Sequence, residues 1–143
     1  MKVLVFGLPG SGKSTLSKPL AELIEGVWIN ADAVREKYND WDFSDEGRMR
    51  QAARMQYLAD GVSMAGKIAI ADFVCPFQKA RDEFKPDYVI WMNTIEAGRF
   101  DDTNKVFEPP KDLDVNYIVD AFRPQEELKL EPIIEKAFRE WQK

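Results

Sequence analysis

The chain has 143 residues, of which 45% are hydrophobic and 31% are charged, and its formal net charge is −5. This length and apolar content suit one continuous core, so we expect residues 1–143 to form a single domain. The acidic balance argues against a nucleic-acid partner, because binding a phosphate backbone requires a basic surface. Since the sequence holds no histidine, imidazole metal sites and imidazole-dependent triads are excluded.

The first apolar run, Lys2 to Phe6, is too short for a secretory signal or a membrane span. We therefore expect a cytoplasmic protein that has no membrane partner. The one cysteine, Cys75, cannot form an internal disulfide, which fits a reducing compartment, and we expect it to be buried at a strand end. The oligomeric state stays open, with a homodimer among the expected forms.

Strand-like and helix-like apolar patterns alternate along the chain. Strands are predicted at 2–6, 27–30, 67–73, 88–92 and 117–119, and helices around 16–24, 44–65 and 124–141. This alternation predicts an α/β fold with three layers, in which a parallel sheet of about five strands carries helices on both faces. A ligand is then expected beyond the carboxyl ends of the strands. The long irregular segment 93–113 is expected to be functional, because compact domains seldom keep such a loop unused.

A glycine-rich loop follows the first strand and opens the first helix. Its residues 7–14 match every fixed position of the motif G-x-x-x-x-G-K-[ST]. Backbone N–H groups of such a loop surround phosphates, Lys13 can reach the β- and γ-phosphates of ATP, and the Ser14 hydroxyl can ligate Mg²⁺. The sequence thus predicts a P-loop NTPase or kinase fold that binds ATP and Mg²⁺. The residues expected to hold the ATP phosphates are Gly7, Leu8, Pro9, Gly10, Ser11, Gly12, Lys13, Ser14 and Thr15.

Two aspartates follow predicted strands and should lie at the carboxyl edge of the sheet. Asp32 comes after the strand at 27–30, where a carboxylate can orient or deprotonate an acceptor hydroxyl and contribute to a metal site. Arg35, three residues later, shares its helical face. The alternative for Asp32 is that it only caps a helix. Asp72 ends the strand at 67–73, where P-loop proteins place the acid that holds Mg²⁺, and its alternative is a loop-capping role.

The helix at 44–65, which Ser44 is expected to cap, carries polar residues at the head of its inward stripe. Arg48 and Gln51 continue the line of the apolar residues toward the N-terminus, so they are expected to face a cleft. For Arg48 the alternative is a structural ion pair. Phe43 precedes this helix, and the sequence leaves open whether it packs in the core or stacks on a substrate base.

These segments resemble the adenylylsulfate kinase family, whose members phosphorylate the ribose 3′-hydroxyl of adenylyl sulfate with ATP. Besides the phosphate loop, residues 30–35 look like the family's D-G-D-x-[VI]-R segment, and residues 43–54 look like its F-S-x-x-x-R-x-x-N-x-x-R stretch. Residues 74–76 are similar to its I-S-P turn, and residues 100–110 keep the spacing of its G-F-T-G-I-D-x-x-Y-E-x-P segment. The resemblance spans roughly the first 120 residues.

The resemblance also implies roles for single residues. Asp32 would be the base at the 3′-hydroxyl, and Phe43 and Phe100 would hold the substrate adenine between them. The residues implied for the phosphosulfate group are Arg35, Arg48 and Gln51.

This chain departs from the family at three places. Asn30 replaces the first Asp of its segment, and Gln51 replaces an Asn. The family's helical lid, with its R-D-x-K-G-L-Y-K-K run, is missing after Thr94, so residues 93–113 form a shortened lid and substrate loop. Lids cover ATP and exclude water, so the loss predicts weaker nucleotide binding, futile hydrolysis or a different acceptor. The nearby cations that could take over are Arg99 and Lys105.

The leading interpretation is an ATP- and Mg²⁺-dependent kinase that transfers the γ-phosphate to a hydroxyl of adenylyl sulfate, with Lys13 and Asp32 as catalytic residues. A second is a P-loop kinase for a nucleoside, a sugar or a polynucleotide 5′-end. A third, from another class, is a nucleotide-binding regulator or NTPase without kinase activity. ATP turnover that rises with one acceptor only would exclude the third.

Overall fold

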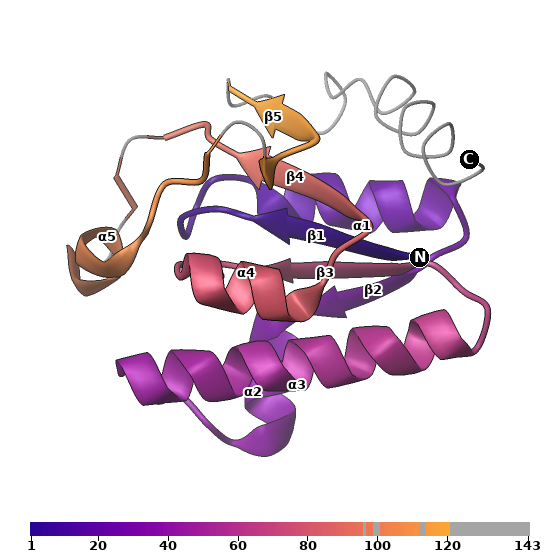
Figure 1. Cartoon of the computed structure of the whole chain (residues 1–143), viewed down its shortest axis with the longest axis horizontal. Helices are drawn as coiled ribbons and strands as arrows, with labels where there is room; N and C mark the ends of the chain where they lie inside the picture. The colour runs from indigo at the N-terminus through magenta and orange to yellow at the C-terminus, as the bar shows by residue number, and fades with distance from the viewer. Residues whose placement is uncertain (96, 99–100, 112–113, 121–143) are drawn as a thin grey trace.

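The structure is a computed structural model that describes residues 1–95, 97–98, 101–111 and 114–120. Within these ranges a 5-stranded sheet has the order β2-β3-β1-β4-β5, so β1 lies at its centre (Figure 1). Every neighbouring pair of strands runs parallel. The strands are β1 (Lys2–Phe6), β2 (Val27–Asn30), β3 (Ala69–Phe73), β4 (Tyr88–Met92) and β5 (Tyr117–Val119).

Helices cover both faces of the sheet, which gives three layers (Figure 1). They are α1 (Lys13–Leu23), α2 (Ala31–Tyr38), α3 (Asp45–Met64), α4 (Gln78–Phe84) and α5 (Asp101–Val106). Successive side chains of β1 point to opposite faces. Val3 therefore packs with Leu16 of α1 in one core cluster, while Leu4 packs with Met55 of α3 and Phe84 of α4 in the other. The α/β fold with helices on both faces is thus confirmed.

β3 is buried along its whole length, as expected for an inner strand covered on both faces. Its one charged residue, Asp72, is 2% exposed and lies near its carboxyl end. Cys75 follows the strand and is also buried, which confirms the sequence prediction. Burial raises the pKa of the Cys75 thiol to about 12, so the group is a neutral part of the core.

Side-chain caps fix where two helices begin. The Ser44 hydroxyl accepts a hydrogen bond from the Gly47 N–H at 3.2 Å, and α3 starts at the next residue, as predicted. Asn30 caps α2, since its Oδ1 accepts from the Ala33 N–H at 3.1 Å. β3 begins at Ala69 rather than at residue 67, because the N–H of residue 67 still bonds to the last turns of α3.

The sequence patterns do not delimit α2, α4 or α5. These helices have 8, 7 and 6 residues, which is too short to display an apolar repeat. α5 corrects the prediction for residues 93–113, which were expected to be irregular throughout. The helix predicted at 124–141 lies outside the described residues.

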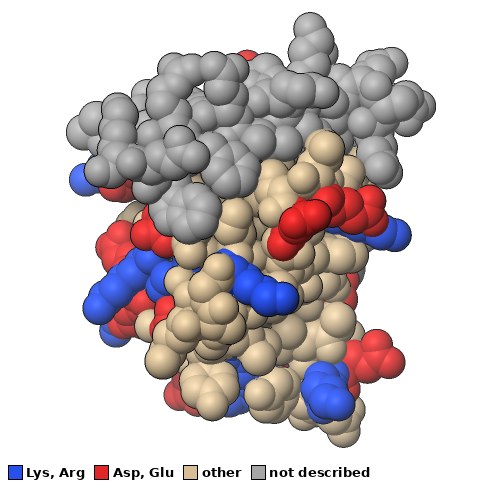
Figure 2. Space-filling model, turned by 90° about the vertical axis from the view of Figure 1, so that its right-hand side faces the viewer, with Lys and Arg blue, Asp and Glu red and all other residues tan. Residues whose placement is uncertain are grey.

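In the described ranges, no helix is both long enough and apolar enough to cross a membrane. Figure 2 views the end of the molecule at which the strands begin. On the described part of this face, Lys and Arg are interspersed with Asp and Glu, so no broad basic area forms there.

Two glycines of α3 give a matched test of how this helix is joined to the preceding loop. A Cβ atom at Gly47 would collide with the carbonyl oxygen of Asp42, whereas nothing lies within 4 Å of one at Gly61. Gly61→Ala should raise the free energy of unfolding by up to about 1 kcal/mol through helix propensity. Gly47→Ala should lower it, because the collision outweighs the same propensity gain. Chemical denaturation measures both, and a stabilised Gly47→Ala protein would contradict this packing.

Candidate active site

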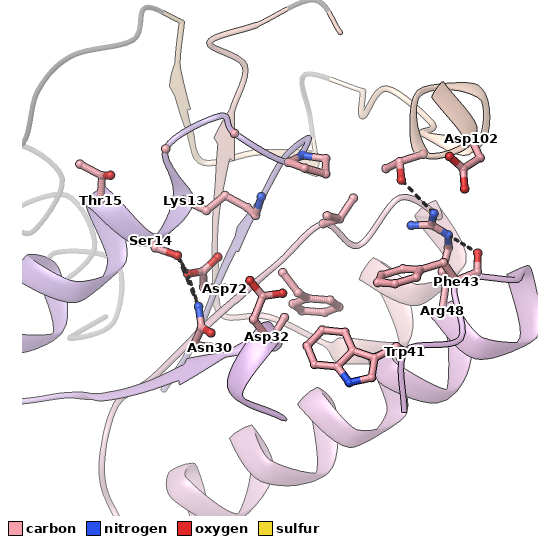
Figure 3. Close-up of a pocket in the computed structure, with 17 residues that line it drawn as sticks. Lys13, Ser14, Thr15, Asn30, Asp32, Trp41, Phe43, Arg48, Asp72 and Asp102 are labelled. Carbon is pink, nitrogen blue, oxygen red and sulfur yellow. Dashed lines mark hydrogen bonds between the residues drawn. The ribbon is translucent and has the colours of Figure 1, made fainter. Parts of the chain in front are cut away.

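A cavity of about 700 Å³ lies at the carboxyl ends of the strands (Figure 3). The phosphate loop, the β2–α2 junction, the connection from α2 into α3, the end of β3 and α5 all contribute to its wall. The first turn of α1 faces the cavity, so the positive end of the helix dipole does too. Of the residues predicted to hold the ATP phosphates, those in the wall are Pro9, Gly10, Gly12, Lys13, Ser14 and Thr15.

The phosphate loop owes its shape to two glycines. Gly12 has a left-handed backbone with φ 97°, and α1 begins directly after it. At Gly7 a Cβ atom would lie 2.7 Å from the Met92 carbonyl oxygen, so only glycine fits this close approach to β4. Thr94 fixes the loop from another side, because its hydroxyl donates to the Ser11 carbonyl oxygen at 2.7 Å. The loop is therefore held in place by the backbone of β4 and by the Thr94 side chain.

Lys13 is the cation of the phosphate loop, and its side chain is partly buried. Its Nζ donates a hydrogen bond to the Leu8 carbonyl oxygen at 3.0 Å. Burial lowers the pKa of this ammonium group, and the nearby carboxylates of Asp72 and Asp32 oppose the shift. A poorly solvated cation at the wall of a cavity is well suited to bind a phosphate, which restores the interactions lost on leaving water.

Asp72 is the buried acid of the site. Its Oδ2 accepts hydrogen bonds from Ser14 Oγ at 3.0 Å, Trp28 Nε1 at 3.2 Å and Asn30 Nδ2 at 3.4 Å. Burial raises the pKa of the Asp72 carboxyl, while Lys13 and these three donors oppose that rise. Because all three bonds end on Oδ2, Oδ1 is the oxygen left for a cation. Ser14 supplies a second hard oxygen beside it, so the residues fit Mg²⁺.

Asp32 lines the same cavity from the first turn of α2 and is exposed. The residue that caps α2 is Asn30, so the alternative in which Asp32 serves only as the cap is wrong. Figure 3 shows the Asp32 carboxylate between the phosphate loop and the aromatic residues of the opposite wall. The described residues contain no cluster of three His, Cys, Asp or Glu side chains that could hold a metal, so Mg²⁺ would take further ligands from phosphates and water.

Arg48 and Phe43 lie on the wall opposite the phosphate loop (Figure 3). Arg48 is 7% exposed and donates through Nε to the Phe43 carbonyl oxygen and through Nη2 to the Thr103 hydroxyl, both at 2.9 Å. Both acceptors are neutral, and no described residue forms an ion pair with Arg48, so its charge remains for a ligand. Burial lowers the pKa of this guanidinium, and Asp102 opposes the shift. Phe43 is 48% exposed, which excludes the core-packing alternative.

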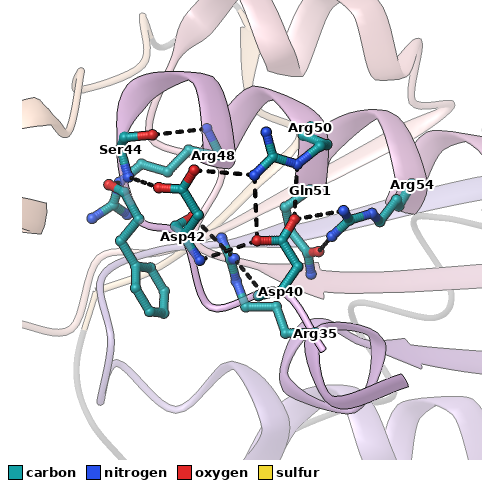
Figure 4. Close-up of polar contacts among 10 residues, drawn as sticks. Arg35, Asp40, Asp42, Ser44, Arg48, Arg50, Gln51 and Arg54 are labelled. Carbon is teal, nitrogen blue, oxygen red and sulfur yellow. Dashed lines mark hydrogen bonds and ion pairs between the residues drawn. The ribbon is translucent and has the colours of Figure 1, made fainter. Parts of the chain in front are cut away.

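The structure does not bring Arg35 and Gln51 into the cavity wall. Arg35 is buried and donates to the carbonyl oxygens of Asp40 and Asp42 at 3.0 and 3.2 Å (Figure 4). Gln51 is buried too, and it donates to the Ala31 carbonyl oxygen at 3.0 Å. Both side chains therefore support the loop and the helix start that form the wall.

Sequence reasoning gave no site role to Trp41, Asp102 or Thr103, which also line the wall. Trp41 could have been found, because it lies two residues before Phe43 in a segment already expected to reach the cleft. Thr103 could not, since its contact with Arg48 joins positions far apart in the sequence. Phe100 lies outside the described residues, and its role stays a prediction.

The parallel sheet and the phosphate loop that follows its central strand define a P-loop kinase fold. The chain is similar to the solved Mycobacterium tuberculosis APS kinase CysC in complex with AMPPNP and APS, with a TM-score of 0.74 and 16% identity over 94% of this chain and 95% of that one. It is also similar to shikimate kinase from Aquifex aeolicus, with a TM-score of 0.68 and 13% identity over 100% of both chains. At these identities the likeness shows the fold alone.

The sequence profile of adenylylsulphate kinase matches residues 1–94, so the chain belongs to the adenylylsulphate kinase family. A curated relative, the adenylyl-sulfate kinase of Bacillus pumilus, is 36% identical over 100 residues, which cover 66% of this chain and 47% of that protein. The chain spans about half the length of the curated relatives it matches.

The burial of Asp72 predicts that this residue opposes folding. Burial raises the pKa of the Asp72 carboxyl in the folded protein above its value in the unfolded chain. The free energy of unfolding should therefore fall as the pH rises through the folded pKa. Asp72→Asn removes the charge and keeps the acceptor oxygen, so the melting temperature of the ligand-free protein should equal or exceed the parent's. The difference in melting temperature between Asp72→Asn and the parent should vanish as the pH falls toward about 4, because Asp72 of the parent is then protonated in the unfolded chain as well as in the fold. A large drop at neutral pH would show instead that attraction to Lys13 dominates.

Proposed function

We propose that this protein is an ATP- and Mg²⁺-dependent kinase that phosphorylates the 3′-hydroxyl of adenylyl sulfate. The products would be ADP and 3′-phosphoadenylyl sulfate. The observation that carries the proposal is a single cavity that joins the phosphate loop to Asp32, to Arg48 and to an aromatic wall. Membership of the family supports both ATP as the donor and adenylyl sulfate as the acceptor.

The phosphates of ATP would bind at the phosphate loop. Backbone N–H groups and the N-terminus of α1 stabilise the anion, and Lys13 exchanges its bond to the Leu8 carbonyl for one to a phosphate oxygen. The partly buried ammonium group then stabilises the charge of the transferring phosphoryl group. Mg²⁺, when bound, neutralises phosphate charge, and its proposed ligands are Ser14, Asp72 and Asp32.

Asp32 is proposed to act on the acceptor. Its exposed carboxylate lies on the wall between the phosphate loop and the aromatic side of the cavity (Figure 3). There it can hold the acceptor hydroxyl in line with the γ-phosphorus and take its proton as the new O–P bond forms.

The opposite wall is proposed to bind the rest of the acceptor. The Arg48 guanidinium bonds there to neutral oxygen atoms and forms no ion pair with a described residue, so it can bind the phosphosulfate group. Phe43 presents an exposed ring to the adenine, and Phe100 is proposed to cover the other face of the base. Arg35 and Gln51 are proposed to support binding indirectly, because they hold the backbone from which this wall is built.

We also propose that residues 1–143 act as a single domain in which residues 93–113 take the place of a longer lid. α5 lies within this segment, and the bond from Arg48 to Thr103 holds it beside the cavity. The use of ATP and the single, buried, free cysteine, Cys75, fit a cytoplasmic enzyme.

Lys13→Ala tests the donor site. The variant should keep the parent's melting temperature and lose about 10²-fold or more in the rate of phosphate transfer, because Lys13 acts on charge that only the ligand brings. Lys79→Ala is the matched control, since Lys79 lies on α4 with its side chain 77% exposed, and it should change neither value. Transfer from labelled ATP and thermal melts measure the two effects. Unchanged turnover in a folded Lys13→Ala protein would refute the kinase proposal.

Asp32→Asn tests the acceptor side. Because the amide keeps an oxygen that can ligate Mg²⁺, we expect ATP affinity and the melting temperature to stay close to the parent's. The turnover number should fall by about 10²-fold or more, the usual scale of general-base catalysis. Glu36→Gln, an exposed carboxylate one turn further along α2, should leave turnover unchanged. A change in stability without a change in turnover would contradict the proposed role.

The acceptor itself is tested by offering the parent enzyme adenylyl sulfate, a nucleoside, a sugar and a polynucleotide 5′-end in parallel with labelled ATP. We expect transfer to adenylyl sulfate. Transfer to another of these acceptors would replace the proposed substrate. Nucleotide binding without transfer to any of them would make the protein a nucleotide-binding regulator or an NTPase.

A further inference from the structure

Arg54 of α3 has no role in the proposed reaction so far, although it lies between two segments that build the acceptor side of the cavity. Its side chain is 16% exposed, and one Nη atom pairs with the carboxylate of Asp40 in residues 39–44, the connection from α2 to α3. The other Nη atom donates to Gln51 Oε1 at 3.3 Å (Figure 4). The ring of Tyr38, the last residue of α2, covers the guanidinium, whose Cζ lies 4.6 Å from the ring centre.

The contact with Gln51 decides which end of that amide faces the start of α2. Arginine offers only N–H donors, so the Gln51 oxygen faces Arg54 and the amide NH₂ group is left for another acceptor. This group donates to the Ala31 carbonyl oxygen at 3.0 Å. The same carbonyl belongs to the peptide unit that contains the nitrogen of Asp32, the proposed base. A series of hydrogen bonds therefore leads from Arg54 through Gln51 to the backbone of Asp32.

The Asp40 end of Arg54 is fixed as well, because Asp40 also accepts a hydrogen bond from Arg50 Nε at 2.8 Å. Bonds from Arg50 and Arg54 hold the pKa of the Asp40 carboxyl well below its usual range, so the group stays charged at neutral pH. Residues 39–44 also carry Phe43. Arg54 thus joins the segment that presents Phe43 to the helix that holds the start of α2.

Stability alone does not account for the amide at position 51. Gln51 is 3% exposed and lies on the buried stripe of α3 with Met55 and Ala59, so an apolar side chain would extend the core there. Replacing both members of a buried hydrogen-bonded pair by apolar groups of the same shape can be nearly neutral for stability. A satisfied polar network instead restricts the backbone to one geometry. A general base requires one geometry, because small displacements of reacting groups slow the reaction.

We propose that Arg54 is a positioning residue that fixes the alignment of Asp32 through Gln51. Arg54 lies outside the cavity wall, so it acts through its partners rather than on a ligand. The inference rests on the proposed function, in which Asp32 acts on the acceptor hydroxyl. Because the same guanidinium pairs with Asp40, the base and the connection from α2 to α3 keep a fixed position relative to α3.

Arg54→Lys separates the two contacts of this side chain. A lysine keeps a cation for Asp40 but lacks the planar fork that reaches a second acceptor, so the Gln51 amide loses its partner. In transfer from labelled ATP to adenylyl sulfate, kcat should fall by about tenfold, because Asp32 is less well aligned. The acceptor KM should change less than kcat, since Arg50 still holds Asp40, and the melting temperature should stay close to the parent's.

Arg50→Gln is the matched control. The parent residue lies on the same helix with its side chain 46% exposed, and among the described residues it bonds to Asp40 and Asp42 rather than to Gln51. The control should raise the acceptor KM by at most about fivefold, the scale of exposed ion pairs, and leave kcat unchanged. Gln51→Met removes the link to α2 itself. Adding Arg54→Lys to Gln51→Met should lower kcat no further, because both changes break one series of bonds.

Hydrogen exchange of the backbone amides of α2 gives a second readout that needs no substrate. Exchange should be faster in Arg54→Lys and in Gln51→Met than in the parent, because the start of the helix is held less firmly. It should be unchanged in Arg50→Gln. The comparison therefore reports the position of α2 whichever acceptor the enzyme uses.

Four outcomes would overturn the role of Arg54: unchanged kcat in Arg54→Lys, an equal loss of kcat in Arg50→Gln, a further loss when Arg54→Lys is added to Gln51→Met, or an Arg54→Lys protein that does not fold. The last would make the residue structural only. Failure of the proposed function is read separately. A parent that transfers phosphate to no acceptor removes the kinase, and the exchange of the α2 amides then decides alone whether Arg54 holds the start of this helix.

Discussion

The parallel pairing of β1 with β3 is the constraint on which the active site depends. In this pairing Val5 lies opposite Asp72, so the buried acid is set beside the strand that leads into the phosphate loop. The loop returns as α1, and Ser14 of its first turn donates to Asp72 at 3.0 Å. β2 pairs with the other edge of β3 and sets Asn30 opposite Asp72 as well. Because parallel strands all end at one edge, a single register brings the loop, the acid and the start of α2 together.

The carboxyl edge of the sheet carries two charged groups, Lys13 and Asp72, whose burial opposes folding. Lys13 and Asp72 are both desolvated, which lowers the pKa of the lysine and raises that of the aspartate. Their mutual attraction and the neutral donors around Asp72 reduce the cost, yet the hydrogen bond from Lys13 within the described part of the chain ends on a carbonyl oxygen, that of Leu8. A phosphate and a divalent cation would give each charge a stronger partner. The arrangement suits binding of an anion with its metal ion better than it suits stability.

The sheet and the phosphate loop could be predicted from the sequence because their signals are local. Apolar runs mark the strands, and the loop motif carries its own chemistry in eight consecutive positions, residues 7–14. Asp32 and Asp72 followed from these, since a residue after a parallel strand must lie at the carboxyl edge. The contact that Gln51 makes was harder to predict. The helical period fixes the face of α3 on which Gln51 lies, but it does not decide whether a long side chain reaches the cavity or, as here, the carbonyl oxygen of Ala31.

The wall that faces the phosphate loop depends on contacts between distant positions. Arg48 is held by Thr103, and the loop with Trp41 is held by Asp40 and its partners on α3. Among the described residues, this wall is built by the connection from α2 to α3, by the start of α3 and by α5 rather than by a strand. Residues of the wall can therefore change without disturbing the strand register that positions the phosphate loop. Under the proposed function, the fold determines the donor site, whereas the connection from α2 to α3 and α5 would determine the choice of acceptor. A short lid segment is compatible with this division, because α5 is fixed by Arg48 rather than by a lid.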